Sequence, residues 1–178
     1  MKKITNESGI FLINRDGVLT DFQCANNNEI GKRVWKHLDI PEEVQVIPGE
    51  IFRNCEIRER LRFPQSLRKI GTDNDGGPFS WSRLPEVNLP ETLEELGDFA
   101  FGHSQLRSLR IPKGLKSKYN RQFKGSSIGT LYLPEEFRTD DHPLGFREQY
   151  EHGWEQYGYI RSILVNNVET GKVIFEQY

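Results

Sequence analysis

The sequence predicts a short α/β solenoid of about four to five coils, with a β-strand of each coil on one face and a capping element at each end. Three observations lead to this prediction: prolines recur at a nearly constant spacing, apolar residues sit at fixed offsets from them, and each unit is too short to bury its own apolar face. At 178 residues the chain can bury one core, so we expect a single domain over residues 1–178. Its expected parts are an N-terminal cap (1–37), the repeats (38–137) and a C-terminal cap (138–178).

A proline ends a strand-like segment in every unit. The best-formed unit is Val87–Gly102, in which Val-x-Leu-Pro precedes Leu93, Leu96 and the pair Ala100-Phe101. Proline cannot donate a hydrogen bond to a neighbouring strand, so it belongs at a strand end. The repeated prolines are Pro41, Pro64, Pro90, Pro112 and Pro134, separated by 23, 26, 22 and 22 residues.

Apolar residues recur at fixed distances from these prolines, as expected for a core shared between stacked coils. In the 26-residue unit the aromatic residue, Phe79, arrives four residues late, after the insertion-like run 72–78. We therefore expect Phe101→Ala to be costly and Phe79→Ala to cost less. The residue three positions after the proline is Val44, Leu67, Leu93, Leu115 or Phe137, and the residue eleven positions after it is Phe52, Phe101 or Phe123.

The repeat resembles the BspA-like class of leucine-rich repeats, which is common in bacterial surface proteins. The family pattern is a strand ending in Ile-Pro, then x-x-Leu-x-x-Ile-Gly, then x-x-Ala-Phe and a small residue or Cys. The resemblance covers about residues 38–137, although Lys118-Tyr119 and Gln122 depart from it in the copy after Pro112. It implies a leucine-rich-repeat solenoid with a role in surface adhesion. The matching pairs are Ile70-Gly71, Leu96-Gly97, Ala100-Phe101 and Asn54-Cys55.

Residues before the repeats predict a β-hairpin that covers the first coil. Its strands are Ile10–Ile13 and Val18–Phe22, and Asp16-Gly17 supplies the turn signal. Solenoids need such caps because an exposed end strand invites aggregation.

Residues after the repeats predict an amphipathic helix ending at Gly158, followed by a closing hairpin of Tyr159–Val165 and Lys172–Phe175. The helix would pack its aromatic stripe on the last coil as a cap, or offer it as a platform that stacks sugars or peptides. The stripe consists of Phe146, Tyr150, Trp154 and Tyr157.

Composition argues against several classes of partner. The net charge of −2 gives no general attraction to nucleic acid or to an anionic membrane, and no apolar span is long enough for membrane insertion. Polar residues follow Met1-Lys-Lys3, so no signal peptide is recognised and a cytoplasmic location is expected, or the cell surface or secretion if a leader was removed. We expect Cys55 to be buried; whether it pairs with Cys24 is left open.

No catalytic motif is recognised, so we expect a protein that is not an enzyme and has no cofactor and no metal site. The nearest approach to a metal cluster is Asp140-Asp141-His142 with His152, in a segment more typical of a solvated loop. The basic segment Arg53–Lys69 is balanced by the acidic segment Glu135–Glu155, so we do not expect nucleic acid as a partner.

The outward face of the strands is the predicted binding surface. By alternation, one row contains Asp39, Arg62, Asn88, Arg110 and Tyr132, and the row beside it contains His37, Arg60, Glu86, Ser108 and Thr130. Arginine and tyrosine are frequent at binding hot spots, although any one of these residues could simply keep the sheet soluble. The candidate partner-binding residues are Arg60, Arg62, Asn88, Arg110 and Tyr132.

These observations favour a non-catalytic module that binds another protein through the sheet. The alternative is a glycan-binding module that uses the C-terminal aromatics, with Trp81 as a further stacking residue. A small enzyme or metal protein built on the C-terminal segment is a third hypothesis. If the sheet binds the partner, substitution of Arg110 and Tyr132 should weaken binding with little change in melting temperature.

Overall fold

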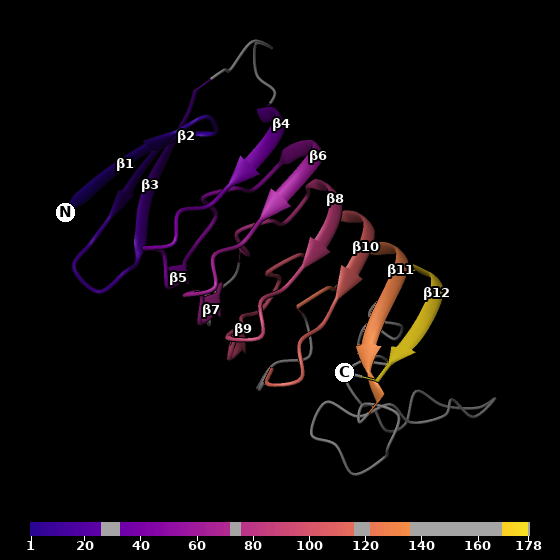
Figure 1. The fold of residues 1–178 in the computed structure, drawn as a ribbon. Helices are drawn as coiled ribbons and strands as arrows, with labels where there is room; N and C mark the ends of the chain where they lie inside the picture. The colour runs from indigo at the N-terminus through magenta and orange to yellow at the C-terminus, as the bar shows by residue number, and fades with distance from the viewer. Residues whose placement is uncertain (26–32, 72–75, 116–121, 136–168, 178) are drawn as a thin grey trace.

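The computed structural model describes residues 1–25, 33–71, 76–115, 122–135 and 169–177, which form a β-solenoid of about four coils. The predicted solenoid is confirmed. The coils follow one another along one axis, with the N-terminal strands at one end and the last strand at the other (Figure 1). The described residues contain no α-helix, because the segments that close each described coil are short strands and turns.

One side of the solenoid is a six-stranded sheet with the order β12-β11-β10-β8-β6-β4, and its neighbouring strands are parallel. Each proline of the repeat lies at or just after the end of its strand. The strands are β4 (Arg33–Asp39), β6 (Cys55–Arg62), β8 (Arg83–Asn88), β10 (Gln105–Arg110), β11 (Ser127–Pro134) and β12 (Glu169–Glu176).

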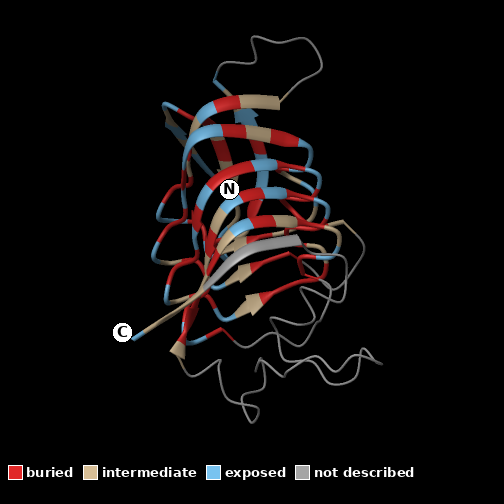
Figure 2. Cartoon of the chain, turned by 90° about the vertical axis from the view of Figure 1, so that its right-hand side faces the viewer, coloured by how far each residue is buried: buried red, intermediate tan, exposed pale blue. Residues whose placement is uncertain are grey.

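The opposite side is a second parallel sheet of three short strands, β5 (Val46–Ile47), β7 (Lys69–Ile70) and β9 (Glu95–Leu96). The core lies between the two sheets, and buried and exposed positions alternate along the coils (Figure 2). One buried row crosses the large sheet from strand to strand. It contains Leu38, Leu61, Val87, Leu109 and Leu131.

A stack of phenylalanine rings runs through the core parallel to the solenoid axis. Phe52, Phe79, Phe101 and Phe123 are at most 1% exposed, and successive ring centroids are 5.2, 5.3 and 5.4 Å apart. The interplanar angles are only 17°, 9° and 7°, so the rings lie nearly parallel. Phe79 takes its place in the stack despite its late position in the repeat, which confirms the predicted register.

A ladder of buried hydroxyl groups lies beside this phenylalanine stack. Ser82, Ser104 and Ser126 each follow a stacked phenylalanine by three residues, and each donates a hydrogen bond to the carbonyl oxygen of the phenylalanine one coil earlier, at 3.3, 2.6 and 2.5 Å. Backbone N–H groups of Cys55, Ser82 and Ser104 donate in turn to the next serine Oγ, each at 3.2 Å. The ladder satisfies polar groups that water cannot reach.

Three antiparallel strands precede the first coil: β1 (Lys2–Asn6), β2 (Gly9–Ile13) and β3 (Leu19–Cys24). The hairpin of β2 and β3 was predicted; β1 was not, because its exposed lysines give no apolar alternation. The Gly17 carbonyl accepts hydrogen bonds from the backbone of Gln45 and Val46 at 2.8 and 3.2 Å, and the Phe22 ring lies 5.1 Å from Phe52. These contacts attach the N-terminal sheet to the first coil, and its capping role stays a prediction.

Only the last part of the C-terminal prediction can be compared with the structure. The predicted aromatic helix and the strand Tyr159–Val165 lie outside the described residues. Lys172–Phe175 forms part of β12, but β12 lies parallel to β11 and extends the large sheet, a pairing that the predicted hairpin did not include. Without β12, the edge of β11 would present unpaired backbone groups. β12 is stabilised there because it pairs with this edge and because Phe175 packs against the core.

Candidate functional site

The predicted binding residues lie on the outward face of the large sheet, in the rows expected from alternation. Asp39 is the register partner of Arg62, and Arg110 lies between Asn88 on β8 and Tyr132 on β11. Glu86, Ser108 and Thr130 are aligned in the same way in the second row, as are His37 and Arg60. The register therefore brings the candidate residues onto one surface.

Arg60 is held by an ion pair at the N-terminal end of this surface. Its Nε donates to Asp39 Oδ1 at 2.9 Å and its terminal nitrogen donates to Oδ2 at 2.5 Å. The hydrogen bonds and charge of Asp39 raise the pKa of the Arg60 guanidinium. Because the pair is exposed, it fixes the direction of the guanidinium more than it stabilises the fold.

His37 and Glu59 form a second charged contact near Arg60. His37 Nε2 and Glu59 Oε2 are 2.9 Å apart, and this hydrogen bond, followed by the nearby charge of Lys36, lowers the pKa of the Glu59 carboxyl group. The surface at this end therefore carries charges of both signs rather than a basic strip.

Among the candidate residues, Arg62 and Asn88 have the weakest side-chain contacts with the rest of the described chain. The Arg62 side chain is 69% exposed, and its nearest carboxylate, Glu42, is 3.8 Å away, too far for a strong hydrogen bond. The Asn88 amide makes no hydrogen bond with any residue in the described part of the chain. Both side chains can therefore turn their donors toward a partner.

Arg110 has a structural role that the sequence did not reveal. Its guanidinium lies 4.6 Å from the centre of the Tyr132 ring and forms an ion pair with Glu176 on β12. The side chains of Arg110 and Glu176 are only 34% and 23% exposed. The expectation that substitution at Arg110 and Tyr132 leaves stability unchanged therefore conflicts with these contacts.

A second surface feature lies where each coil turns toward the large sheet. Asn54, Trp81 and His103 each follow a stacked phenylalanine by two residues and have positive φ angles of 54°, 61° and 55°; Gly125 holds the same position at 72°. The Trp81 and His103 rings are stacked, with centroids 4.3 Å apart and an interplanar angle of 15°. We call Asn54, Trp81, His103 and Gly125 the left-handed ladder.

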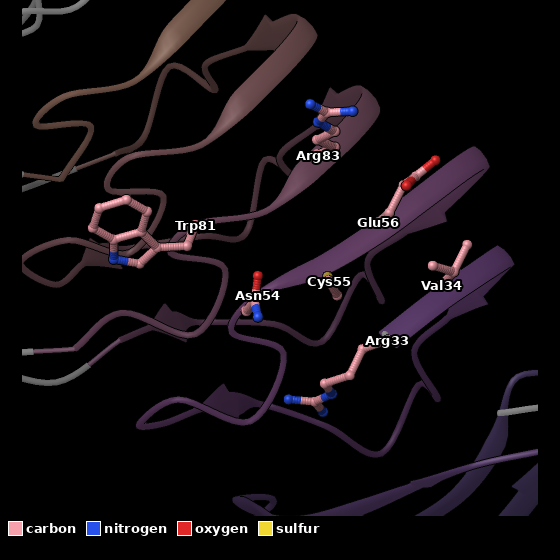
Figure 3. A pocket seen from close by; sticks show the side chains of 7 residues that line it. All are labelled: Arg33, Val34, Asn54, Cys55, Glu56, Trp81 and Arg83. Carbon is pink, nitrogen blue, oxygen red and sulfur yellow. The ribbon is translucent and has the colours of Figure 1, made fainter. Parts of the chain in front are cut away.

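A pocket of about 320 Å³ opens beside this ladder. Its lining includes Arg33, Asn54, Glu56, Trp81 and Arg83, which come from three successive coils (Figure 3). No spacing pattern along the chain indicates this pocket, since its residues are brought together only by the stacking of coils. The offset from each phenylalanine would have identified the ladder itself.

The chemistry of the described residues offers no metal centre. No group of three or more His, Cys, Asp or Glu side chains is close enough to hold an ion there, and the sequence cluster Asp140-Asp141-His142 with His152 lies outside the described residues. The pKa of the Cys55 thiol is raised to about 11. Burial is the largest cause of this rise, and the hydrogen bond with Ser82 opposes it. Cys55 is buried as predicted, and both it and Cys24 are free thiols.

Within the part of the chain that the structure describes, no helix is long and apolar enough to cross a membrane.

Parallel strands on one face, short strands on the other and a phenylalanine stack between them define a leucine-rich-repeat solenoid. Residues 30–139 match the family described as BspA type leucine-rich repeat region, in six copies. The chain belongs to this family. Neither the curated proteins nor the solved structures gave a match.

Proposed function

We propose that this protein is a non-catalytic module that presents the outward face of its six-stranded sheet to another protein. Leucine-rich repeats usually mediate protein interactions, and the family is generally non-catalytic. The observation that carries the proposal is that Asn88, Arg110 and Tyr132 are aligned on neighbouring strands, with Arg62 on the same outward face. Together they offer charged, amide and aromatic groups on one surface. Such residues supply large contact areas and directional hydrogen bonds.

Within this surface the candidate residues have different roles. Arg62 and Asn88 supply the free donors, because the fold engages them least. Tyr132 offers its ring beside them, and Arg110 holds that ring in place. Arg60, fixed by Asp39, directs a positive charge at the edge of the surface.

A charge reversal on each side of the solenoid tests this proposal. Arg68, on the side of the short strands, is the comparison residue for Arg62: each lies 3.8 Å from a single glutamate and is about half exposed or more. Arg68 also donates a hydrogen bond to the Thr92 carbonyl at 3.1 Å. Affinity capture from cells would use the intact chain, Arg62→Glu combined with Asn88→Ala, and Arg68→Glu. We expect a specific protein to be retained by the intact chain and by Arg68→Glu and to be lost with the double variant.

Thermal unfolding of the three proteins provides the control for folding. If the double variant unfolds at the same temperature and still retains the protein, the sheet face is not the binding surface. If the double variant and Arg68→Glu both lose the protein, the partner binds outside the sheet face or responds only to the overall charge of the solenoid.

The C-terminal aromatics of the glycan-binding alternative lie outside the described residues. Its other proposed residue, Trp81, is described, and its surroundings support a more specific inference.

A further inference from the structure

Trp81 is in a conformation and an environment that do not suit tryptophan. Its φ of 61° lies in the left-handed region, which bulky residues rarely adopt. Trp81 is also 55% exposed, whereas the other large hydrophobic residues in the described part of the repeats are buried or half-buried. Strained residues that persist on a surface are concentrated at binding sites, so Trp81 is a candidate for ligand contact.

The equivalent residues in the other coils show which residue types suit the left-handed backbone at this position. Asn54, His103 and Gly125 hold the same left-handed position, and asparagine, histidine and glycine adopt it more easily than tryptophan does. The backbone N–H groups of Asn54, Trp81 and His103 all donate to the next coil in the same way, at 2.9, 2.8 and 2.8 Å. The backbone therefore does not require an aromatic residue at position 81.

The Trp81 indole has one stacking partner in the described residues and is otherwise largely exposed. That partner is His103 of the next coil, at 4.3 Å. The preceding coil places only the small Asn54 at this position, and both Asn54 and Trp81 line the pocket (Figure 3). At about 320 Å³ the pocket lies at the small end of ligand sites, a size suited to a single ring.

The charges around the pocket favour an anion. Arg33 and Arg83 line it, and Glu56 is the one negatively charged residue among its described lining residues. Arg58 Nε already donates to Glu56 at 3.0 Å, which offsets that charge. Arg33 is fixed by hydrogen bonds to the carbonyl oxygens of Ile51 and Arg53, whereas Arg83 has no side-chain partner among the described residues.

The polar groups of the pocket further restrict the chemical class of ligand that fits it. The Glu56 carboxylate accepts hydrogen bonds but cannot donate them, and the free Asn54 amide can do both. A ligand that fits must carry an anionic group for Arg83, hydroxyl donors for Glu56 and Asn54, and a ring face for Trp81. A bare phosphate or sulfate has no ring to stack on Trp81.

We propose that the pocket beside Trp81 binds a sugar ring that carries a carboxylate, such as a uronic acid unit. Trp81 stacks on the ring, Arg83 pairs with the carboxylate, and Asn54 and Glu56 bind hydroxyl groups. This site lies at the turns beside the sheet and does not depend on the protein-binding face proposed above.

Glucuronate and glucose form a matched pair of probes, because they differ only in the carboxylate. Each would be titrated into the full chain while the indole N–H signals of its three tryptophans are followed by NMR. We expect glucuronate to shift the Trp81 signal with a Kd of about 1 mM, as befits a single ring, and glucose to bind about tenfold more weakly.

Three variants locate the binding. Trp81→Asn introduces the residue that the first coil carries at this position, so the fold should persist while glucuronate affinity, measured by calorimetry, falls about tenfold. Arg83→Gln should reduce glucuronate affinity to that of glucose. Arg107→Gln alters an exposed arginine on the next strand that does not line the pocket, and it should leave the affinity unchanged.

Equal affinity for glucuronate and glucose, or no shift of the Trp81 signal by glucuronate, would overturn the proposal. A peptide of six glutamates would be titrated in parallel. If that peptide shifts the Trp81 signal and glucuronate does not, the pocket recognises an acidic protein segment and the sugar proposal is wrong. Loss of protein capture with the sheet variants has no bearing on these titrations, so the two proposals can fail separately.

Discussion

The guanidinium of Arg110 lies 4.6 Å from the centre of the Tyr132 ring, and the same group forms an ion pair with Glu176. These three residues come from β10, β11 and β12, so one side chain links the last three strands of the sheet. Two residues of the predicted binding row, Arg110 and Tyr132, therefore also help to hold the last strand.

Replacing Arg110 with alanine should lower the free energy of unfolding by about 1 kcal/mol, since a partly exposed cation–π contact and one partly exposed ion pair are lost. Glu176→Gln should reproduce part of this loss. Arg62→Ala, on the same face but without close partners, should change stability by less than about 0.5 kcal/mol. Urea unfolding measures all three; equal effects of Arg110→Ala and Arg62→Ala would contradict the linking role of Arg110.

Phe79→Ala and Phe101→Ala should each cost about 3 to 5 kcal/mol. Both rings are fully buried and stacked between two neighbours, and Phe79 also meets Phe63 edge to face at 5.6 Å. The structure thus gives no reason for the smaller loss that the insertion before Phe79 suggested. Calorimetric or urea unfolding of the two variants provides the comparison, and a much smaller loss at Phe79 would show that its coil relaxes.

Ser104→Ala should cost about 1 to 3 kcal/mol, because the carbonyl of Phe79 and the N–H of Ser82 both lose a buried partner. Ser104→Cys should cost less, since Cys55 occupies the equivalent position in the first coil and a thiol is a weak donor. Ser127→Ala, at a half-buried neighbouring position, is the control for the loss of a hydroxyl group. Chemical denaturation would rank the three; similar stability of Ser104→Ala and the wild type would argue against the hydroxyl ladder.

Thiol labelling should distinguish the two cysteines. Only the thiolate reacts, and the pKa of about 11 keeps Cys55 protonated at pH 8. At this pH we expect iodoacetamide to label Cys24, which is partly exposed, while Cys55 stays unmodified until the protein unfolds. Mass spectrometry after iodoacetamide treatment, with and without denaturant, gives the result; rapid native labelling of Cys55 would show that its coil opens.

The repeat could be predicted because the same chemistry recurs at the same offset in every coil. Leu93, Leu96 and Phe101 face inward for the same reason that Leu67, Ile70 and Phe79 do, and a single insertion shifts the spacing without changing the packing. Alternation likewise placed Arg62 and Asn88 on the outward face, as the register shows.

Other features could not be predicted, because they depend on contacts between segments that no local sequence pattern links. The position of β12 depends on the free edge of β11, and the pairing of Arg110 with Glu176 follows from that position. The left-handed backbone of Trp81 could not be predicted from tryptophan itself, which disfavours it, but only from its alignment with Asn54, His103 and Gly125. The pocket beside it requires three coils to be stacked before it exists.

The phenylalanine stack also bears on the order in which the molecule opens. At its first coil the stack continues into the N-terminal sheet, where Phe52 meets Phe22 at 5.1 Å and Phe22 meets Phe11 at 4.7 Å. Each coil is stabilised mainly by its immediate neighbours, so fraying begins at whichever end has the weaker interface. Amide protons near Phe52, which has ring contacts on both sides, should then exchange with solvent slowly. The N-terminal sheet and the first coil are therefore expected to open together, as one unit, before a protease can cut either of them.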